Sequence, residues 1–66
     1  MRIQVNGQPR EVPEGSTVLT LLGESGLKAQ NVAVELNRRI LRGERYGEPL
    51  KEGDQVEIVT FVGGGA

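Results

Sequence analysis

Apolar and polar residues alternate at the start of the chain, and this alternation predicts a hairpin of two strands. In residues 2–6 every second side chain is apolar, which is the period of a half-buried strand. Asn6 and Gly7 follow, a dipeptide that tolerates the positive φ angles of a type I′ turn. We therefore expect a second strand over about residues 8–12, at a sheet edge because Pro9 has no amide hydrogen to donate.

A short helix is predicted after this hairpin. Ser16 is the expected N-cap, and the apolar positions after it fall on one helical face: Val18, Leu21 and Leu22. Gly26 suits the left-handed position that closes a helix, and Leu27 is expected to fold back onto it. Because the helix is short, docking onto a sheet must supply most of its stability.

The second half of the chain carries two further strand patterns, separated by an irregular stretch. Residues 32–37 alternate clearly, whereas residues 38–50 contain glycine and proline breakers and predict a loop with a short strand near Ile40. The inward anchors expected in this loop are Ile40, Leu41 and Leu50. A turn at Gly53 and Asp54 leads into a last strand. One face of that strand carries Val56, Ile58, Thr60 and Val62, and the other carries Glu57, Val59 and Phe61.

These elements predict an α+β domain in which one main helix packs on a mixed sheet of about four strands. The crossover rule places the strand after the helix parallel to another strand of the same sheet. The expected boundaries are a domain over residues 1–62 and a flexible glycine-rich tail over residues 63–66. At 66 residues the chain has room for one small domain.

The amino-acid composition disfavours several classes of function. The sequence contains no Cys and no His, so it lacks the commonest general base, the strongest nucleophile and the two best zinc ligands. It therefore disfavours a self-sufficient enzyme and a metal site. Eight basic residues against nine acidic ones give a net charge of −1, which does not fit a dedicated nucleic-acid binder. Neither a membrane span nor a secretory signal is present in the sequence, which predicts a cytoplasmic location.

The tail is the most informative feature. Three consecutive glycines, Gly63 to Gly65, are costly to order, so they are either a frayed end or a segment with a purpose. A tail without β-carbons can enter a tunnel that is too narrow for other residues. Four extended residues reach roughly 13–14 Å past the last strand, which is far enough to present a terminal carboxylate to another protein.

Several segments together resemble a known family. They are Ile3-Gln4-Val5-Asn6-Gly7, Ser16-Thr17-Val18 with Leu21-Leu22, Val32-Ala33-Val34-Glu35-Leu36-Asn37, and Leu50 to Ile58 running on to the glycines. In their order and spacing these segments resemble the ThiS-type sulfur carriers of thiamin biosynthesis, which belong to the ubiquitin-like β-grasp group. The resemblance spans residues 1–65 and implies a β-grasp fold.

The resemblance also implies a cycle of sulfur transfer. An E1-like (ThiF-like) enzyme would use ATP to adenylate the terminal glycine, and a sulfur donor protein would convert it to a thiocarboxylate. The thiocarboxylate would then give its sulfur to a ThiG-like thiazole synthase. In this cycle the chain is a protein co-substrate with no bound cofactor, because it lacks a phosphate-binding Gly-rich loop.

The sequence departs from the family pattern at its end. The family's terminal diglycine falls on Gly64 and Gly65, and Ala66 follows as an extra residue that blocks the glycine carboxyl group. Three explanations are open: a protease removes Ala66, the residue is an artefact of cloning or annotation, or the transfer has been lost. Trimming by a protease is the leading hypothesis, and it makes Gly65 the sulfur-carrying residue.

A partner surface is predicted at the base of the tail. Val59 and Phe61 are expected on the sheet face away from the helix, beside polar Gln4, Glu35 and Glu57, and exposed apolar side chains next to a reactive tail indicate docking. The predicted partner-binding residues are Val59, Phe61, Val62 and Gly63. The alternative is that Phe61 folds over a sheet edge into the core. A basic cluster, formed by Arg38, Arg39, Arg42 and Arg45, is interpreted as a solvated loop.

Two alternative functions remain open from the sequence. A related carrier would supply sulfur to molybdopterin, cysteine or a thiolated tRNA, and the compact loop between Leu36 and Leu50 favours the thiamin type over the longer molybdopterin-synthase subunit. A non-covalent β-grasp binding module would not need its glycines, and it would keep its affinity after residues 63–66 were deleted.

Overall fold

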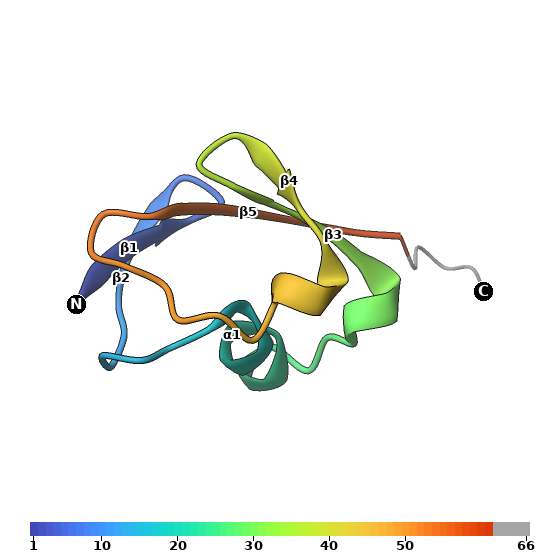
Figure 1. The fold of residues 1–66 in the computed structure, drawn as a ribbon, viewed down its shortest axis with the longest axis horizontal. Helices are drawn as coiled ribbons and strands as arrows, with labels where there is room; N and C mark the ends of the chain where they lie inside the picture. Colours follow the sequence, from blue (N-terminus) through green and yellow to red (C-terminus); the bar gives the residue numbers. More distant parts are fainter. Residues whose placement is uncertain (62–66) are drawn as a thin grey trace.

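The computed structural model describes residues 1–61, which form a mixed sheet packed on one face against a helix (Figure 1). The strand order is β2-β1-β5-β3-β4. The strands are β1 (Arg2–Val5), β2 (Gln8–Glu11), β3 (Val32–Leu36), β4 (Arg39–Leu41) and β5 (Gln55–Thr60). The helix is α1 (Val18–Glu24), and two short 3-10 helices are η1 (Ala29–Asn31) and η2 (Gly43–Arg45).

This arrangement is the predicted β-grasp, with one strand more than the predicted four within the described residues. The fifth strand is β4, the short strand expected near Ile40. The sheet is mixed because β5 runs parallel to β1, whereas the pairs β1–β2, β3–β5 and β3–β4 are antiparallel. The pairings also make β2 and β3, which α1 connects, run in the same direction, as the crossover rule predicts.

Two hairpin turns frame the sheet. Asn6 and Gly7 have φ angles of 52° and 82°, so the predicted type I′ turn is confirmed, and Pro9 lies on edge strand β2 as expected. A second turn joins β3 to β4, with φ angles of 53° at Asn37 and 70° at Arg38. The sequence gives less warning of this turn, because arginine is a poor residue for a positive φ angle.

Arg38 offers a simple test of this backbone. A β-carbon in the left-handed region costs roughly 1–2 kcal/mol, so we expect Arg38→Gly to raise the free energy of unfolding by about 0.5–1 kcal/mol after the extra entropy of the unfolded chain is included. Urea unfolding followed by circular dichroism measures this. The matched control is Arg39→Gly in β4, which should lower the free energy of unfolding by about 0.5–1 kcal/mol. A loss of stability in Arg38→Gly as well would contradict the strained turn.

The ends of α1 follow local chemistry, with one correction. The N-cap is Thr17 and not Ser16: the Thr17 hydroxyl accepts a hydrogen bond from the amide of Thr20 (3.1 Å), and the Thr20 hydroxyl accepts one from the amide of Thr17 (2.9 Å). The Ser16 hydroxyl instead donates to the Pro13 carbonyl (2.7 Å), and Ser16 is buried under the loop that reaches Leu50.

The predicted closing of the helix is confirmed. Gly26 has a φ angle of 71°, and the amide of Leu27 donates to the Leu22 carbonyl at 2.9 Å, which is the hydrogen-bond pattern of a Schellman motif. The Leu27 side chain packs against the core, as expected.

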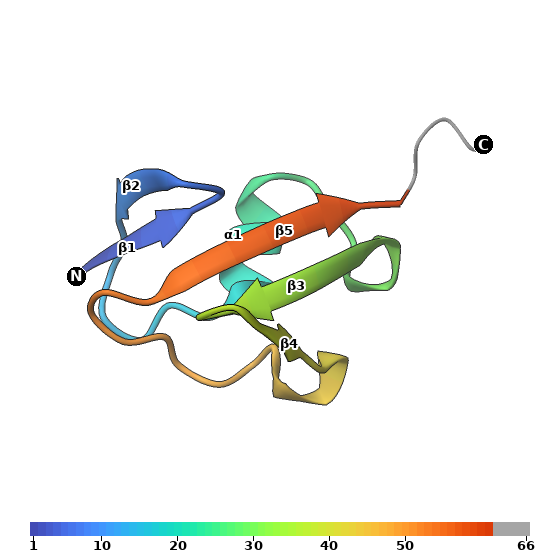
Figure 2. The ribbon, with the colours of Figure 1, turned by 90° about the horizontal axis from the view of Figure 1, so that it is seen from above.

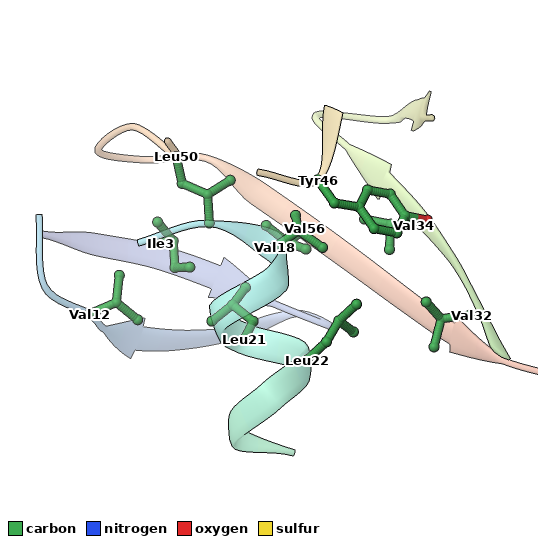
Figure 3. Packing of buried hydrophobic residues seen from close by; sticks show 10 residues of the cluster. All are labelled: Ile3, Val12, Val18, Leu21, Leu22, Val32, Val34, Tyr46, Leu50 and Val56. Atoms are coloured by element: carbon green, nitrogen blue, oxygen red, sulfur yellow. The ribbon is translucent and has the colours of Figure 1, made fainter. Parts of the chain in front are cut away.

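The core lies between α1 and the sheet (Figure 3). Its buried apolar residues are Ile3, Val12, Val18, Leu21, Leu22, Val32, Val34, Tyr46, Leu50 and Val56. The helix face predicted from the sequence is therefore buried, and Leu41 and Leu50 face inward as expected. Val62 and residues 63–66, which include the predicted tail, lie outside the described residues.

Ile40 was predicted to face inward, and this is wrong: its side chain is 71% exposed. The turn at residues 37 and 38 pairs Leu36 with Arg39, so the next pair is Glu35 with Ile40. Glu35 points away from the helix, and Ile40 shares its face. Tyr46, which the sequence analysis did not assign to the core, is only 5% exposed and belongs to the buried cluster.

Candidate functional site

β5 is the strand that leads to the C-terminal end of the described chain, and it lies in the middle of the sheet (Figure 2). Its side chains alternate between the two faces: Val56 is fully buried under α1, whereas Glu57 and Val59 are exposed on the opposite face. The register with β3 places Ala33 beside Val59 and Glu35 beside Glu57. The predicted assignment of the two faces is therefore confirmed for residues 56–59, with Ile58 packed against the core, whereas Thr60 is exposed.

Two exposed apolar side chains mark the end of this strand. Val59 is 60% exposed and Phe61 is 64% exposed, so neither belongs to the core. The alternative in which Phe61 folds over a sheet edge into the core is therefore wrong. We call Val59 and Phe61 the tail-root patch, because the glycine segment begins two residues after Phe61. Their role in binding a partner remains a prediction.

The rest of this sheet face is polar, as predicted, with one addition. Gln4, Glu35 and Glu57 are exposed, and the two glutamates are direct neighbours across β3 and β5. Ile40 adds a further exposed apolar side chain on the same face, beside Glu35. The sequence analysis missed Ile40, although the two-residue turn at Asn37 and Arg38 is the signal from which its outward direction follows.

Two asparagine side chains hydrogen-bond to β5 or to the residue before it, and each is the first of the two loop residues in a hairpin turn. The Asn6 side-chain oxygen accepts a hydrogen bond from the amide of Ile58 at 2.7 Å. The Asn37 side-chain oxygen accepts one from the amide of Gln55 at 2.9 Å, and its amide nitrogen donates to Asp54 at 3.0 Å. Because these turns belong to different hairpins, β5 is fastened to both halves of the sheet.

The four arginines of the basic cluster are all exposed, as expected, but they do not lie on one loop: Arg39 begins β4 and Arg45 ends η2. Arg42 pairs with Glu44 at 3.7 Å, and Arg45 pairs with Glu48 at 3.2 Å. The hydrogen bond to Glu48, followed by the charge of Glu48, raises the pKa of Arg45 above its ordinary value. Arginine is charged at physiological pH with or without this shift. Because all four side chains of these ion pairs are exposed, the pairs contribute little to the free energy of unfolding.

Four of the predicted site residues lie outside the described residues: Val62, Gly63, Gly64 and Gly65, as does Ala66. Within residues 1–61 there is no pocket and no group of three potential metal-ligating side chains. No helix in this part of the chain is long and apolar enough to cross a membrane. The candidate site in the described chain is thus the tail-root patch on the surface of β5.

Comparison with known proteins supports the resemblance seen in the sequence. The profile of the ThiS family matches residues 3–65, nearly the whole chain. The chain belongs to the ThiS family. It is 41% identical to the sulfur carrier protein ThiS of Thermus thermophilus, and the match covers 96% of this chain and 98% of that protein. This ThiS-family chain also resembles the crystal structure of the thiamine biosynthesis protein ThiS from Geobacter metallireducens, with a TM-score of 0.78 and 39% identity over 98% of this chain and 100% of that one.

Other relatives of this ThiS-family chain are much longer. It is 40% identical to a thiazole synthase of Paramagnetospirillum magneticum, and the match covers 100% of this chain but 21% of that protein. The chain thus spans about a fifth of the length of the thiazole synthases it matches. A segment similar to this chain is therefore part of proteins named as thiazole synthases.

Proposed function

We propose that this chain is the sulfur carrier for thiamin thiazole formation, and that the carboxyl group of Gly65 carries the sulfur. The observation that supports this most directly is the match over nearly the full length of both chains to a ThiS sulfur carrier. The match includes the two glycines at positions 64 and 65 within the family profile. The tail-root patch supplies an exposed apolar surface directly before them.

The proposed chemistry has two steps, and both take place on a partner. A carboxylate is a poor electrophile, so the Gly65 carboxylate first attacks the α-phosphorus of ATP on an E1-like adenylating enzyme and displaces pyrophosphate. A sulfide-level nucleophile from the sulfur donor then attacks the acyl-adenylate, AMP leaves, and a thiocarboxylate remains. This chain contributes the carboxyl group and the docking surface and binds no cofactor of its own, since the partner binds the ATP.

The proposed acceptor is a thiazole synthase. Two thiazole synthases each contain a segment that is 40% or 41% identical to this chain, which supports the proposal that carrier and acceptor work together. A covalent link suits two proteins that work on each other, because it raises the effective concentration of one at the other.

The proposal requires a free carboxyl group on Gly65, which is in peptide linkage to Ala66 in this sequence. We propose that a protease removes Ala66. The cleavage exposes a terminal glycine, and a residue without a β-carbon can enter a narrow active-site tunnel.

The test is the intact mass of the protein from its native cells, grown without thiamin, before and after treatment with a thiol-alkylating reagent. Because the sequence has no cysteine, we expect alkylation only on a species that ends at Gly65 and is heavier by the difference between sulfur and oxygen. Cells that lack the adenylating enzyme are the control and should contain only the unalkylated form. A protein that keeps Ala66 and is never alkylated under these conditions would refute the proposal and favour the binding module.

A further inference from the structure

One edge of β5 is left unpaired near the tail. The odd-numbered residues of β5 form backbone hydrogen bonds with β3. Phe61, the residue after β5, continues this pattern: its amide donates to the carbonyl of Asn31, the residue before β3 (2.8 Å). Even-numbered positions face β1, as the Val56 carbonyl does, which accepts from the amide of Asn6 (2.8 Å). Since β1 ends at Val5, this side of β5 loses its neighbour halfway along.

The Asn6 side chain occupies the last position on that side by accepting the amide of Ile58. Beyond it, the Ile58 carbonyl and the Thr60 amide have no hydrogen-bond partner among residues 1–61. Figure 2 shows the β1–β2 hairpin flanking the first part of β5, while the part near the arrowhead has no strand on that side. Thr60 is exposed and Ile58 is half-buried.

The two outer edges of the sheet are protected against pairing, whereas this one is not. Edge strand β2 contains Pro9 followed by two charged residues, and edge strand β4 has only three residues and begins with Arg39. Proline, charge and short length are the usual devices that keep a sheet edge from adding a strand. The open edge of β5 has the sequence Ile58-Val59-Thr60-Phe61, which is rich in residues that favour strands.

We infer that an extended segment of the adenylating enzyme pairs with the open edge of β5. One residue of a parallel strand placed opposite Val59 would donate its amide to the Ile58 carbonyl and accept from the Thr60 amide. An apolar side chain on that strand would lie beside the tail-root patch. This inference rests on the proposed function and adds how the enzyme recognises the carrier: through backbone hydrogen bonds as well as apolar contact.

The position of the edge argues for this occupant. Gly65 is four residues beyond Phe61, so it lies within roughly 13–14 Å of Phe61 even when the chain is fully extended. A protein that pairs with this edge therefore has its surface close to the carbon that must be activated. The paired strand also fixes the direction in which the chain leaves the sheet.

Thr60→Pro is a selective test. The Thr60 amide faces away from β3, because residues 32 and 60 form a pair without mutual hydrogen bonds, so proline removes the outward donor and no internal ladder bond. Thr60→Val is the matched control, since it keeps the amide and the branched shape. A chemically synthesised chain with an ester in place of the Val59–Thr60 amide removes the same donor and avoids the proline ring, although it also weakens the Val59 carbonyl as an acceptor toward β3.

We expect all three variants to unfold cooperatively by urea, which shows that each is folded in the binding experiment. Titration against the purified adenylating enzyme should give a Kd about tenfold higher for Thr60→Pro and for the ester than for Thr60→Val, the effect of losing one well-placed hydrogen bond in an interface. If Thr60→Pro fails to fold, the ester variant decides the question.

The outcomes separate the two proposals. Equal affinity of the ester and Thr60→Val overturns the strand pairing and leaves the sulfur-carrier function standing. No binding of the unmodified chain to the enzyme overturns both the proposed function and the pairing. A concentration-dependent dimer of the unmodified chain that the ester abolishes would identify a second copy as the occupant, and it would overturn the enzyme as the partner of this edge.

Discussion

Leu21→Ala is expected to lower the free energy of unfolding by about 2–5 kcal/mol. Leu21 is 1% exposed and lies in the core between α1 and the sheet (Figure 3), so truncation leaves a cavity that a short helix cannot close. A chain of this size has a total stability of about 3–10 kcal/mol, so the loss removes much of it. Urea unfolding followed by circular dichroism measures the change.

The matched control is Leu19→Ala, the same substitution two residues earlier in the same helix. Leu19 is 49% exposed, so its truncation forfeits only part of the transfer energy and should cost about 1 kcal/mol or less. Equal losses for the two variants would show that helix propensity, rather than packing onto the sheet, determines the stability of α1. Our account of the core would then be wrong.

Phe61→Ala is expected to reduce kcat/KM for adenylation of a chain ending at Gly65 by about 30-fold, the effect of losing roughly 2 kcal/mol at an aromatic anchor of an interface. The free energy of unfolding should change by no more than about 0.5 kcal/mol, because the Phe61 side chain is 64% exposed and outside the core. Adenylation is measured as pyrophosphate release by the purified enzyme.

Leu19→Ala also serves as the control for this experiment. It removes an exposed apolar side chain from α1, which packs on the opposite side of the sheet from the tail-root patch, so adenylation should be unchanged. Unchanged kcat/KM in Phe61→Ala would exclude the patch as a docking surface. A large loss of stability in Phe61→Ala would instead assign Phe61 a structural role.

Local chemistry made much of the fold predictable. The turn at Asn6 and Gly7 and the helix closure at Gly26 depend on which residues tolerate positive φ angles, and neighbouring residues decide that. The two faces of β5 follow from simple alternation, which is why the exposure of Val59 and Phe61 could be predicted before the sheet was known.

Features that depend on register or on distant contacts were less predictable. Ile40 and Leu41 are adjacent apolar residues, and only the pairing of Leu36 with Arg39 determines that Ile40 points outward. Thr17 rather than Ser16 caps α1, since Ser16 is tied to the loops around Pro13 and Leu50. The burial of Tyr46 likewise depends on contacts with residues that are distant in the sequence.

The candidate site was also only partly predictable from the sequence. Its apolar side chains were predicted from the pattern of β5, whereas the support from Asn6 and Asn37 was not. Each asparagine reaches a strand that is at least 18 residues away in the sequence, at Ile58 and at Gln55. Such contacts exist only after the whole sheet has formed, and a linear pattern carries no sign of them.

The central position of β5 also governs when this protein can fold. β5 pairs with β1 and β3, so the two hairpins have no direct contact through the sheet until the chain has been synthesised to about residue 60. Because its key pairings join segments so far apart in sequence, we expect the domain to fold only once β5 has been synthesised, and more slowly than a helical protein of equal length. An unfinished chain would therefore present no completed surface to the proposed activating enzyme, so only chains synthesised past β5 could enter the proposed sulfur cycle.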